Sequence, residues 1–409
     1  AINEDDVEEF FADIKYRLNT TAATNDGAVK GVIVAEIGGI QFGNGSAGDF
    51  SGDGIAFEVR DAYTDFQLPG VQNKARVSIG LQAFTVNPFV WWEKVPAVLF
   101  KGNTGAFDYT LGWARGFESL NTSDEQDLFE DADALLARGD FKPAEGTKLG
   151  LFALYQRSSS FDSSDEDSGD NFILGQGASP GYLIKQFDEA DYDLYTLGVD
   201  GGFTTPTSYG NAFVNWDVIY QGGSIDTLRE DDADVNSYLL HADLGINVGA
   251  TRFTYTGWYA SGDDDDADDD FENFLATDVD RFDSVIFFEG GFTDDDYFTE
   301  APYILNKGLI FNKLAVDHNL SEKTTVGGAL IYLMTAEDLT LADGSKEDKL
   351  GTEIDVTISH KLYDNLELAL NGGYLFADDG MDFWEGTASA DGDSDTDIYR
   401  ITSRVRYKF

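Results

Sequence analysis

The few basic residues of this chain are unevenly placed. The chain has 27 Lys and Arg against 76 Asp and Glu, for a formal charge of -49, yet its last segment reads DIYRITSRVRYKF. Successive side chains of an extended strand point to opposite faces, so Arg400, Arg404, Arg406 and Lys408 share one face. Cations gathered on one face can bind an anion or set the charge preference of a channel.

Further cations lie on the polar phase of segments near the start of the chain. Early and late strands become neighbours when a sheet closes into a barrel, so these cations could join those of the last segment. The alternative is that they pair with interior carboxylates such as Asp13 and Glu58. The predicted basic wall consists of Lys15, Arg17, Arg60, Lys74, Arg76, Arg400, Arg404 and Arg406.

Two Asp-rich runs are candidates for cation binding. Asp391, Asp393 and Asp395 alternate in DGDSDTD, and a denser run begins at Asp263 and Asp265. Carboxylates are the ligands that Ca²⁺ prefers, although the first run lacks the Gly and the closing Glu of a calcium loop. We therefore consider Ca²⁺ at these five residues, against diffuse counter-ion screening or adaptation to a salty medium. No cofactor is expected to be required.

The composition excludes several classes of protein. There is no Cys, which excludes disulfides, thiolate metal sites and Cys nucleophiles. A chain this acidic is a poor partner for nucleic acid, whose phosphates need clustered Lys and Arg. Among the 3 His, His241 shares a polar face with Asp243, but no Ser is matched to them. We predict that the protein is not an enzyme.

The chain alternates between apolar and polar residues almost throughout, which predicts strands rather than helices. In KARVSIGLQAFT, for example, Val77, Ile79 and Leu81 lie on one face, while Arg76 and Gln82 lie on the other. The predicted strands are 17 segments: 8–20, 28–42, 55–68, 73–86, 96–102, 106–118, 133–143, 147–158, 191–203, 210–222, 235–248, 251–262, 307–320, 324–338, 349–363, 366–379 and 397–409.

The connections between these segments alternate between short and long. Short turns such as 249–250 and 364–365 alternate with long connections such as 87–95, 159–190 and 263–306. This alternation predicts an up-and-down antiparallel sheet with tight turns at one end. The acidic runs lie almost wholly in the long connections, so one end of the molecule should be strongly negative.

A sheet of this size needs closure, because a barrel leaves no edge. Strands of about a dozen residues with one polar and one apolar face are typical of transmembrane β-barrels, which are apolar outside and polar within. Aromatic residues near strand ends fit interfacial girdles. These residues are Tyr16, Tyr63, Trp113, Tyr155, Tyr220, Tyr259, Tyr363 and Tyr407.

The last strand alternates apolar residues and ends on an aromatic one, at Val405, Tyr407 and Phe409. In this it resembles the bacterial outer-membrane β-barrel proteins, and the porins in particular. The resemblance implies that these three residues are an assembly signal read by the barrel-assembly machinery. Residues 55–102 also resemble the porin order of strand, turn, strand, inward-folding loop and strand. The resemblance places a constriction loop at Trp91, Trp92, Glu93 and Lys94, although the Pro-Glu-Phe-Gly-Gly signature of that loop is absent.

The resemblance implies a passive porin in the bacterial outer membrane. We expect a single barrel domain over residues 1–409, passing small hydrophilic solutes as a homotrimer surrounded by outer-membrane lipid and lipopolysaccharide. Alternatives are a substrate-selective anion channel, a cation-binding surface barrel, or a sheath around an electron-transfer partner. Closed bacterial barrels have even strand numbers, so 17 segments imply either a missing N-terminal strand, giving 18, or a misread segment (96–102 or 133–143), giving 16.

Overall fold

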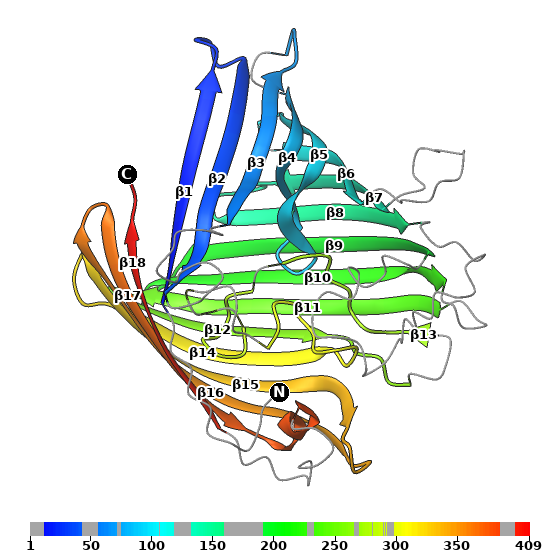
Figure 1. The fold of residues 1–409 in the computed structure, drawn as a ribbon, viewed down its shortest axis with the longest axis vertical. Coiled ribbons are helices and arrows are strands. Elements are labelled where there is room, and N and C mark those ends of the chain that lie inside the picture. Colours follow the sequence, from blue (N-terminus) through cyan, green and yellow to red (C-terminus); the bar gives the residue numbers. More distant parts are fainter. Residues whose placement is uncertain are drawn as a thin grey trace.

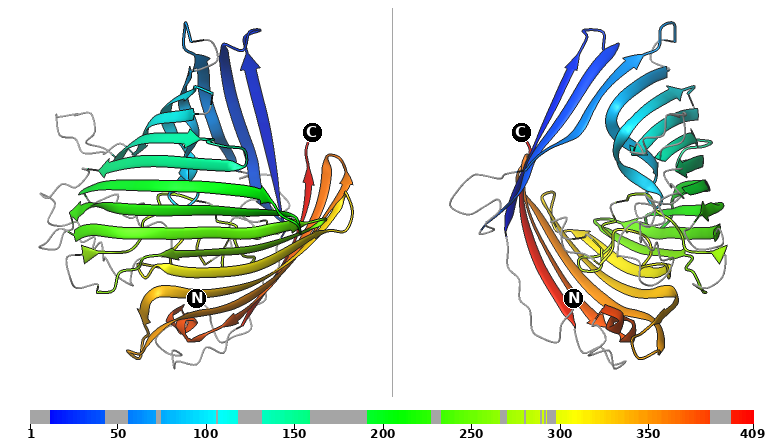
Figure 2. Two further views of the ribbon diagram at one scale, coloured as in Figure 1. Left: turned by 180° about the vertical axis from the view of Figure 1, so that it is seen from behind. Right: turned by 45° about the vertical axis from the view of Figure 1, so that its right-hand side comes forward.

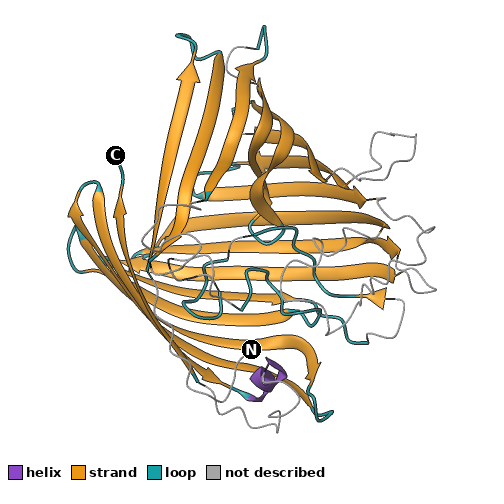
Figure 3. Ribbon diagram, in the orientation of Figure 1, coloured by secondary structure: helices purple, strands orange, loops and turns teal. Residues whose placement is uncertain are grey.

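The computed structural model describes most of the chain, with gaps in several connections. The described residues are 12–42, 56–71, 75–105, 107–117, 132–158, 191–226, 233–265, 270–279, 281–288, 290, 292, 298–384 and 397–409. In these residues strands dominate, and the one helical segment is the short 3₁₀ helix η1 (Asp379–Trp384) (Figure 3). Among them, no helix has the length and apolarity needed to cross a membrane.

All seventeen predicted strand segments are confirmed, and the structure adds the two-residue strand β13. Segments 96–102 and 133–143, of which one was considered misread, form β5 and β7, so the 16-strand alternative is wrong. The strands are β1 (Asp13–Ala23), β2 (Val29–Gln41), β3 (Phe57–Gln67), β4 (Ala75–Asn87), β5 (Trp91–Asn103), β6 (Phe107–Phe117), β7 (Ala132–Phe141), β8 (Thr147–Ser158), β9 (Asp191–Pro206), β10 (Asn211–Asp226), β11 (Ala233–Val248), β12 (Thr251–Ala260), β13 (Asp270–Phe271), β14 (Leu309–Asn319), β15 (Thr324–Thr340), β16 (Lys346–Tyr363), β17 (Leu366–Ala377) and β18 (Ile398–Tyr407).

Each long strand pairs antiparallel with the next one along the chain, from β1 to β12 and from β14 to β18. β12 pairs directly with β14, and β13 adds a short parallel contact to β11. The result is one strongly curved up-and-down sheet that surrounds an interior (Figures 1 and 2). β1 and β18 are its first and last strands.

The convex face of the sheet is apolar. Val218 and Leu240 lie directly opposite each other on β10 and β11, and they are 48% and 46% exposed. Large apolar side chains exposed over a whole face indicate contact with lipid. A row of tyrosines crosses this face on neighbouring strands, as expected of a girdle: Tyr155, Tyr195, Tyr220, Tyr238 and Tyr259. Tyr63, by contrast, lies on the inward face with Asp61 and Asp65, so its predicted place in a girdle is wrong.

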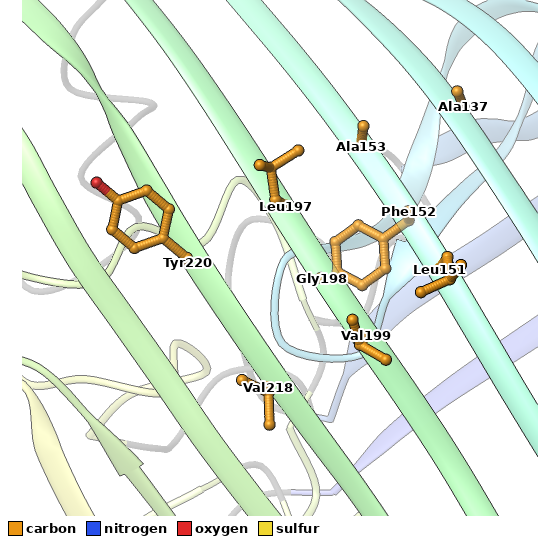
Figure 4. Close-up of a pocket in the computed structure, with 9 residues that line it drawn as sticks. All are labelled: Ala137, Leu151, Phe152, Ala153, Leu197, Gly198, Val199, Val218 and Tyr220. Carbon is orange, nitrogen blue, oxygen red and sulfur yellow. The ribbon is translucent and has the colours of Figure 1, made fainter.

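A shallow apolar groove of about 490 Å³ runs over β7 to β10 on the convex face (Figure 4). The small side chains of Ala137 and Ala153 leave room beside Leu197 and Tyr220. At Gly198, a Cβ atom would lie 2.1 Å from the Phe152 ring, so this aromatic side chain packs where only glycine fits. Apart from the Tyr220 hydroxyl, the side chains that line the groove are apolar, so the groove belongs to the apolar outer surface.

Candidate functional site in the barrel interior

The polarity of the inward-facing side chains differs from one part of the sheet to another. On β1 to β4 and β16 to β18 the inward face carries the charged residues described below, whereas on β7 to β11 the half toward the long connections is largely apolar and buried. An apolar face of this size is unfavourable in water, so it requires a covering. The buried inward-facing residues of β7 to β11 include Leu136, Phe152, Leu154, Leu194, Ile219 and Leu239.

The chain between β12 and β14 supplies this covering. Its described residues between 261 and 308, here the interior segment, lie on the concave side of the sheet (Figure 2, right). Phe274, Phe287 and Phe288 are fully buried and join one hydrophobic core with the strand residues. Residues 263–306 were predicted as one of the long connections, and their described part folds into the interior of the sheet. Their apolar side chains are buried against the apolar inner face of the sheet.

The hairpin of β4 and β5 also reaches into the interior. The predicted long connection 87–95 is a tight turn between Asn87 and Trp91, because the two strands continue almost to its tip. The Asn87 side chain donates a hydrogen bond of 2.6 Å to Asp217 on β10. The tip also binds the interior segment, with hydrogen bonds from Trp92 N to Asp278 O (2.7 Å) and from Thr277 N to Val90 O (2.8 Å).

A buried carboxylate fixes the interior segment to the opposite wall. Glu353 on β16 is fully buried and accepts hydrogen bonds from the backbone N–H groups of Val285 (2.9 Å), Ile286 (2.7 Å) and Phe287 (3.2 Å). Asp355, two residues further on the same face, accepts a bond of 3.2 Å from Val285 N. Three backbone donors are suitable partners for a carboxylate that is removed from water.

Arg281 and His241 lie where the hairpin tip meets the interior segment, and both contact the Phe89 ring. The Arg281 guanidinium lies 4.0 Å from the centre of the Phe89 ring and 4.7 Å from that of Trp258, and it pairs with Asp283 at 2.5 Å. The predicted pair of His241 and Asp243 does face inward. His241 Nδ1 lies 2.6 Å from Asp217, and its Nε2 lies 3.3 Å from Asp243.

His241 therefore belongs to a packed polar cluster beneath the hairpin tip, where it also contacts the Phe89 ring. Both ring nitrogens of His241 meet carboxylates, those of Asp217 and Asp243. This arrangement serves packing of the hairpin tip against β10 and β11.

The structure divides the predicted basic wall between the two edges of the sheet. On the first edge, Arg17 pairs with Glu36, and Arg60 lies 3.8 Å from Glu36 and 3.9 Å from Glu58. Arg76 pairs with Asp65 on β3. Each of these cations thus faces a carboxylate, and Glu58 is one of the two partners that the alternative interpretation named.

On the other edge, Arg404 and Arg406 both contact one carboxylate, that of Glu367, at 3.4 and 2.9 Å. The Arg404 guanidinium also lies 4.3 Å from the centre of the Phe292 ring. Arg400 lies on the same strand, Lys15 lies on β1, and Lys74 is outside the described residues. Among the described residues no backbone pairing joins β1 to β18, so the predicted meeting of the two halves of the wall stays a prediction.

The residues predicted to form a constriction loop begin strand β5 instead. Trp91 is buried and packs on Phe84 with ring centres 4.7 Å apart, whereas Trp92 is 51% exposed. Lys94 pairs with Asp61 on β3 at 2.8 Å, and Glu93 accepts a bond from the Lys94 backbone N–H. As the resemblance implied, these residues belong to a segment that enters the interior. They do so as part of strand β5 and not as a loop.

The predicted calcium ligands are only partly within the described residues. Asp391, Asp393 and Asp395 lie outside them. Asp263 is buried, and its side chain accepts a bond of 3.2 Å from Asn306, while Asp265 is exposed. Within the described ranges, no three His, Asp or Glu residues are grouped so that they could hold a metal ion.

Sequence reasoning missed inward-facing cations, among them Arg138. Arg138 on β7 pairs with Asp140 and Asp200, each at 2.6 Å, and donates a bond of 3.0 Å to the carbonyl oxygen of Val86 near the hairpin tip. It occupies the inward phase of its segment, so the alternation of β7 could have indicated it. Its partner on β9 could not be identified, because that requires the pairing of strands.

Apolar outside, charged along part of the inside and narrowed by inserted segments, the sheet has the architecture of a porin-type transmembrane β-barrel. Solved structures share this fold. The outer membrane protein opdK of Pseudomonas aeruginosa superposes with a TM-score of 0.59 and 11% identity, covering 97% of this chain and 95% of that one. A structure of OpdK with vanillate gives a TM-score of 0.57, 12% identity and coverages of 96% and 91%.

A third similar structure is that of P. aeruginosa OccK2 (OpdF) in complex with glucuronate, with a TM-score of 0.53, 12% identity and coverages of 97% and 90%. At these identities the likeness concerns the fold. No protein-family model matches the sequence, and no curated protein matches it.

Proposed function

We propose that this protein is an outer-membrane porin whose interior passes small hydrophilic solutes. The observation that carries the proposal is the segregation of side chains in one sheet of membrane-spanning length. Val218 and Leu240 are exposed on its outside, whereas Arg60, Arg76 and Arg404 are paired with carboxylates on its inside. In lipid, only a closed barrel of such strands satisfies its backbone, and its interior can then hold water.

The conducting path runs along the charged side of the interior. The interior segment and the hairpin tip cover the apolar part of the inner face of β7 to β11, and we assign the path to the charged residues of β1 to β4 and β16 to β18. Arg17, Arg404 and Arg406 there keep 51%, 35% and 43% of their side chains exposed. In a confined channel with low-dielectric walls, such charges dominate selectivity.

The second proposal concerns selectivity for carboxylate solutes. Arg404 and Arg406 share the single carboxylate of Glu367, and 35% and 43% of their side chains remain exposed. Two guanidinium groups with one anionic partner favour a second anion, and the Arg fork suits a carboxylate. Vanillate and glucuronate, in the structures of the two similar proteins, are both carboxylates.

The remaining alternatives are less well supported. A sheath for an electron-transfer partner needs an unobstructed lumen, whereas the interior segment here packs a hydrophobic core inside the sheet. A cation-binding surface barrel would depend on acidic runs that lie largely outside the described residues. The porin proposal includes assembly by the barrel-assembly machinery into a homotrimer that is surrounded by lipopolysaccharide. The two alternatives do not include these partners.

The test is conductance of the purified full-length protein in planar bilayers. We expect discrete, ohmic steps and partial block by glucuronate added to one side. Glucose, of similar size but uncharged, is the matched control and should block less. Equal block by both sugars would remove the carboxylate proposal, and silent bilayers would remove the porin proposal. Native mass spectrometry of the same sample checks the trimer.

A further inference from the structure

Outward-facing side chains of β7, β8 and β9 form rows across the sheet, because paired residues of neighbouring strands lie side by side. The first row lines the apolar groove of Figure 4, and the next two rows lie successively closer to the long connections. Starting at the groove, the rows are Ala137, Ala153 and Leu197, then Leu135, Tyr155 and Tyr195, and then Asp133, Arg157 and Asp193. An apolar groove, an aromatic girdle and a charged row thus follow one another along the same strands.

The charged row holds an exposed guanidinium. The side chain of Arg157 is 45% exposed and lies 3.8 Å from the half-exposed carboxylate of Asp193, which also accepts a hydrogen bond from the Tyr155 hydroxyl. Asp133, on the other side of Arg157, is buried and accepts a bond of 2.9 Å from Arg115. Other donors of the barrel wall therefore bind both carboxylates, while the Arg157 guanidinium remains exposed on the outward face.

The tyrosines fix the level of this row in the membrane. Tyr155 and Tyr195 belong to the girdle, and girdles of transmembrane barrels lie at the membrane interfaces. Arg157, two residues beyond Tyr155 on β8, therefore lies at the level of the lipid headgroups, where an outward charge costs little. This inference rests on the proposed porin function, in which the long connections are extracellular and these headgroups belong to the lipopolysaccharide of the outer leaflet.

We propose that Arg157 and the groove together bind one lipid A unit of lipopolysaccharide, with a phosphate on the guanidinium and an acyl chain in the groove. The planar guanidinium can bind a phosphate through two parallel hydrogen bonds. Ala153 lies four residues before Arg157 on β8, which is roughly 13 Å at the usual rise of a strand. The acyl chains of lipid A begin beneath its phosphorylated sugars and run in this direction, past the tyrosine row and into the groove.

The order of the three rows favours a lipid over a second copy of this chain. A lipid presents its anionic group, its interfacial region and its acyl chains in the same order in which β8 presents Arg157, Tyr155 and Ala153. The groove, of about 490 Å³, is shallow and lined by apolar side chains apart from the Tyr220 hydroxyl. It therefore suits a flexible hydrocarbon chain and offers a partner protein almost no hydrogen bond.

The test is the binding of diphosphoryl lipid A to the full-length protein, purified as folded, heat-modifiable barrel in detergent and titrated by native mass spectrometry. We expect saturable binding to the wild type. Arg157→Gln should bind about tenfold more weakly, because it loses a charged hydrogen-bonding group. Ala153→Leu fills the groove without changing the charge and should bind several-fold more weakly.

Two matched controls should bind lipid A like the wild type. Arg252→Gln removes an exposed Arg at the short-turn end of β12. Ala62→Leu enlarges an exposed Ala on the outward face of β3, opposite Ile33 on β2 and away from the groove. Both controls make the same chemical change as the test variants at a different place.

Wild-type affinity in folded Arg157→Gln or in folded Ala153→Leu would overturn the site, and so would equally tight binding of lipid A stripped of its phosphates. Phosphatidylglycerol that binds as tightly as lipid A, and loses affinity in the same two variants, would overturn the assignment to lipopolysaccharide. Loss of an oligomer in Ala153→Leu with unchanged lipid A binding would overturn it in favour of a contact between copies. Binding is measured without conductance, so failure of this site and failure of the porin function are distinguishable.

Discussion

Glu353 on β16 accepts a 2.7 Å hydrogen bond from the backbone N–H of Ile286, and so ties the interior segment to the barrel wall. The same carboxylate binds Val285 N and Phe287 N, so one side chain orients three consecutive peptide groups. Because the carboxylate is fully buried, it depends on these donors for its solvation.

Glu353→Gln should loosen the interior segment. The amide has one acceptor oxygen in place of two and adds two donors, and each hydrogen bond to a buried charged group is worth about 1.5–3 kcal/mol. We expect a larger and noisier single-channel conductance with the barrel still folded. Glu347→Gln, six residues earlier on β16 and outside this contact, should leave the conductance unchanged. An unchanged conductance in Glu353→Gln would mean that the interior segment does not limit the path.

Replacing both Arg404 and Arg406 with Gln should shift the reversal potential toward cations at every salt concentration. These side chains face the proposed path, where their field is focused, whereas exposed loop charges are screened beyond about 8 Å at physiological salt. Lowering the salt should also move the wild type toward cations, because the acidic connections then act over longer distances.

The control for this pair is Arg157→Gln on β8. Arg157 is on the outward phase of its strand and lies 3.8 Å from Asp193. Its loss should leave the reversal potential where it is. If the double Gln variant behaves like this control, β18 does not line the permeation path.

Asn87→Asp should detach the hairpin tip from β10. It replaces the amide that donates to Asp217 with a second carboxylate at the same place, which removes a hydrogen bond and adds like-charge repulsion. We expect about 1–3 kcal/mol less stability and a higher conductance. Combining it with Asp217→Asn restores one amide and one carboxylate, and should recover the wild-type conductance. Asn211→Asp, at the exposed end of β10, is the single-site control.

Phe409→Ala should reduce assembly more than stability. Phe409 is 87% exposed, and its ring centre lies 6.0 Å from that of Tyr407. Its burial therefore contributes well under the roughly 1.5–3 kcal/mol of a fully buried Phe. We expect several-fold less folded barrel in cells, measured by heat modifiability on gels, with an unchanged melting temperature for what does fold. Tyr209→Ala, which removes an 80% exposed aromatic at a short turn, should not change the yield.

The strands could be predicted because a strand with one polar and one apolar face shows alternating polar and apolar residues in the sequence. β8 is an example, since its predicted and observed bounds coincide at Thr147 and Ser158. The interior segment was missed because irregular backbone has no period. Phe287 and Phe288, adjacent in a connection that should be solvated, were the available indication of its burial.

Ion pairs inside the barrel could be predicted only in part. Alternation places Arg76, Arg138 and Arg404 on the inward phase, but partners depend on register and on contacts between distant strands. Arg138 meets Asp200 across 62 residues of sequence. The predicted meeting of the first and last strands in one basic wall requires a closed seam, and the edges β1 and β18 are not paired in the described residues.

The central claim is that the charged side of the interior conducts. It is tested most directly by the single-channel conductance of the full-length wild-type protein, inserted into planar bilayers from a preparation that runs as folded, heat-modifiable barrel. We predict discrete, ohmic conductance steps that disappear when the protein is heat-denatured before addition. Bilayers that contain folded protein and remain silent would contradict the porin account.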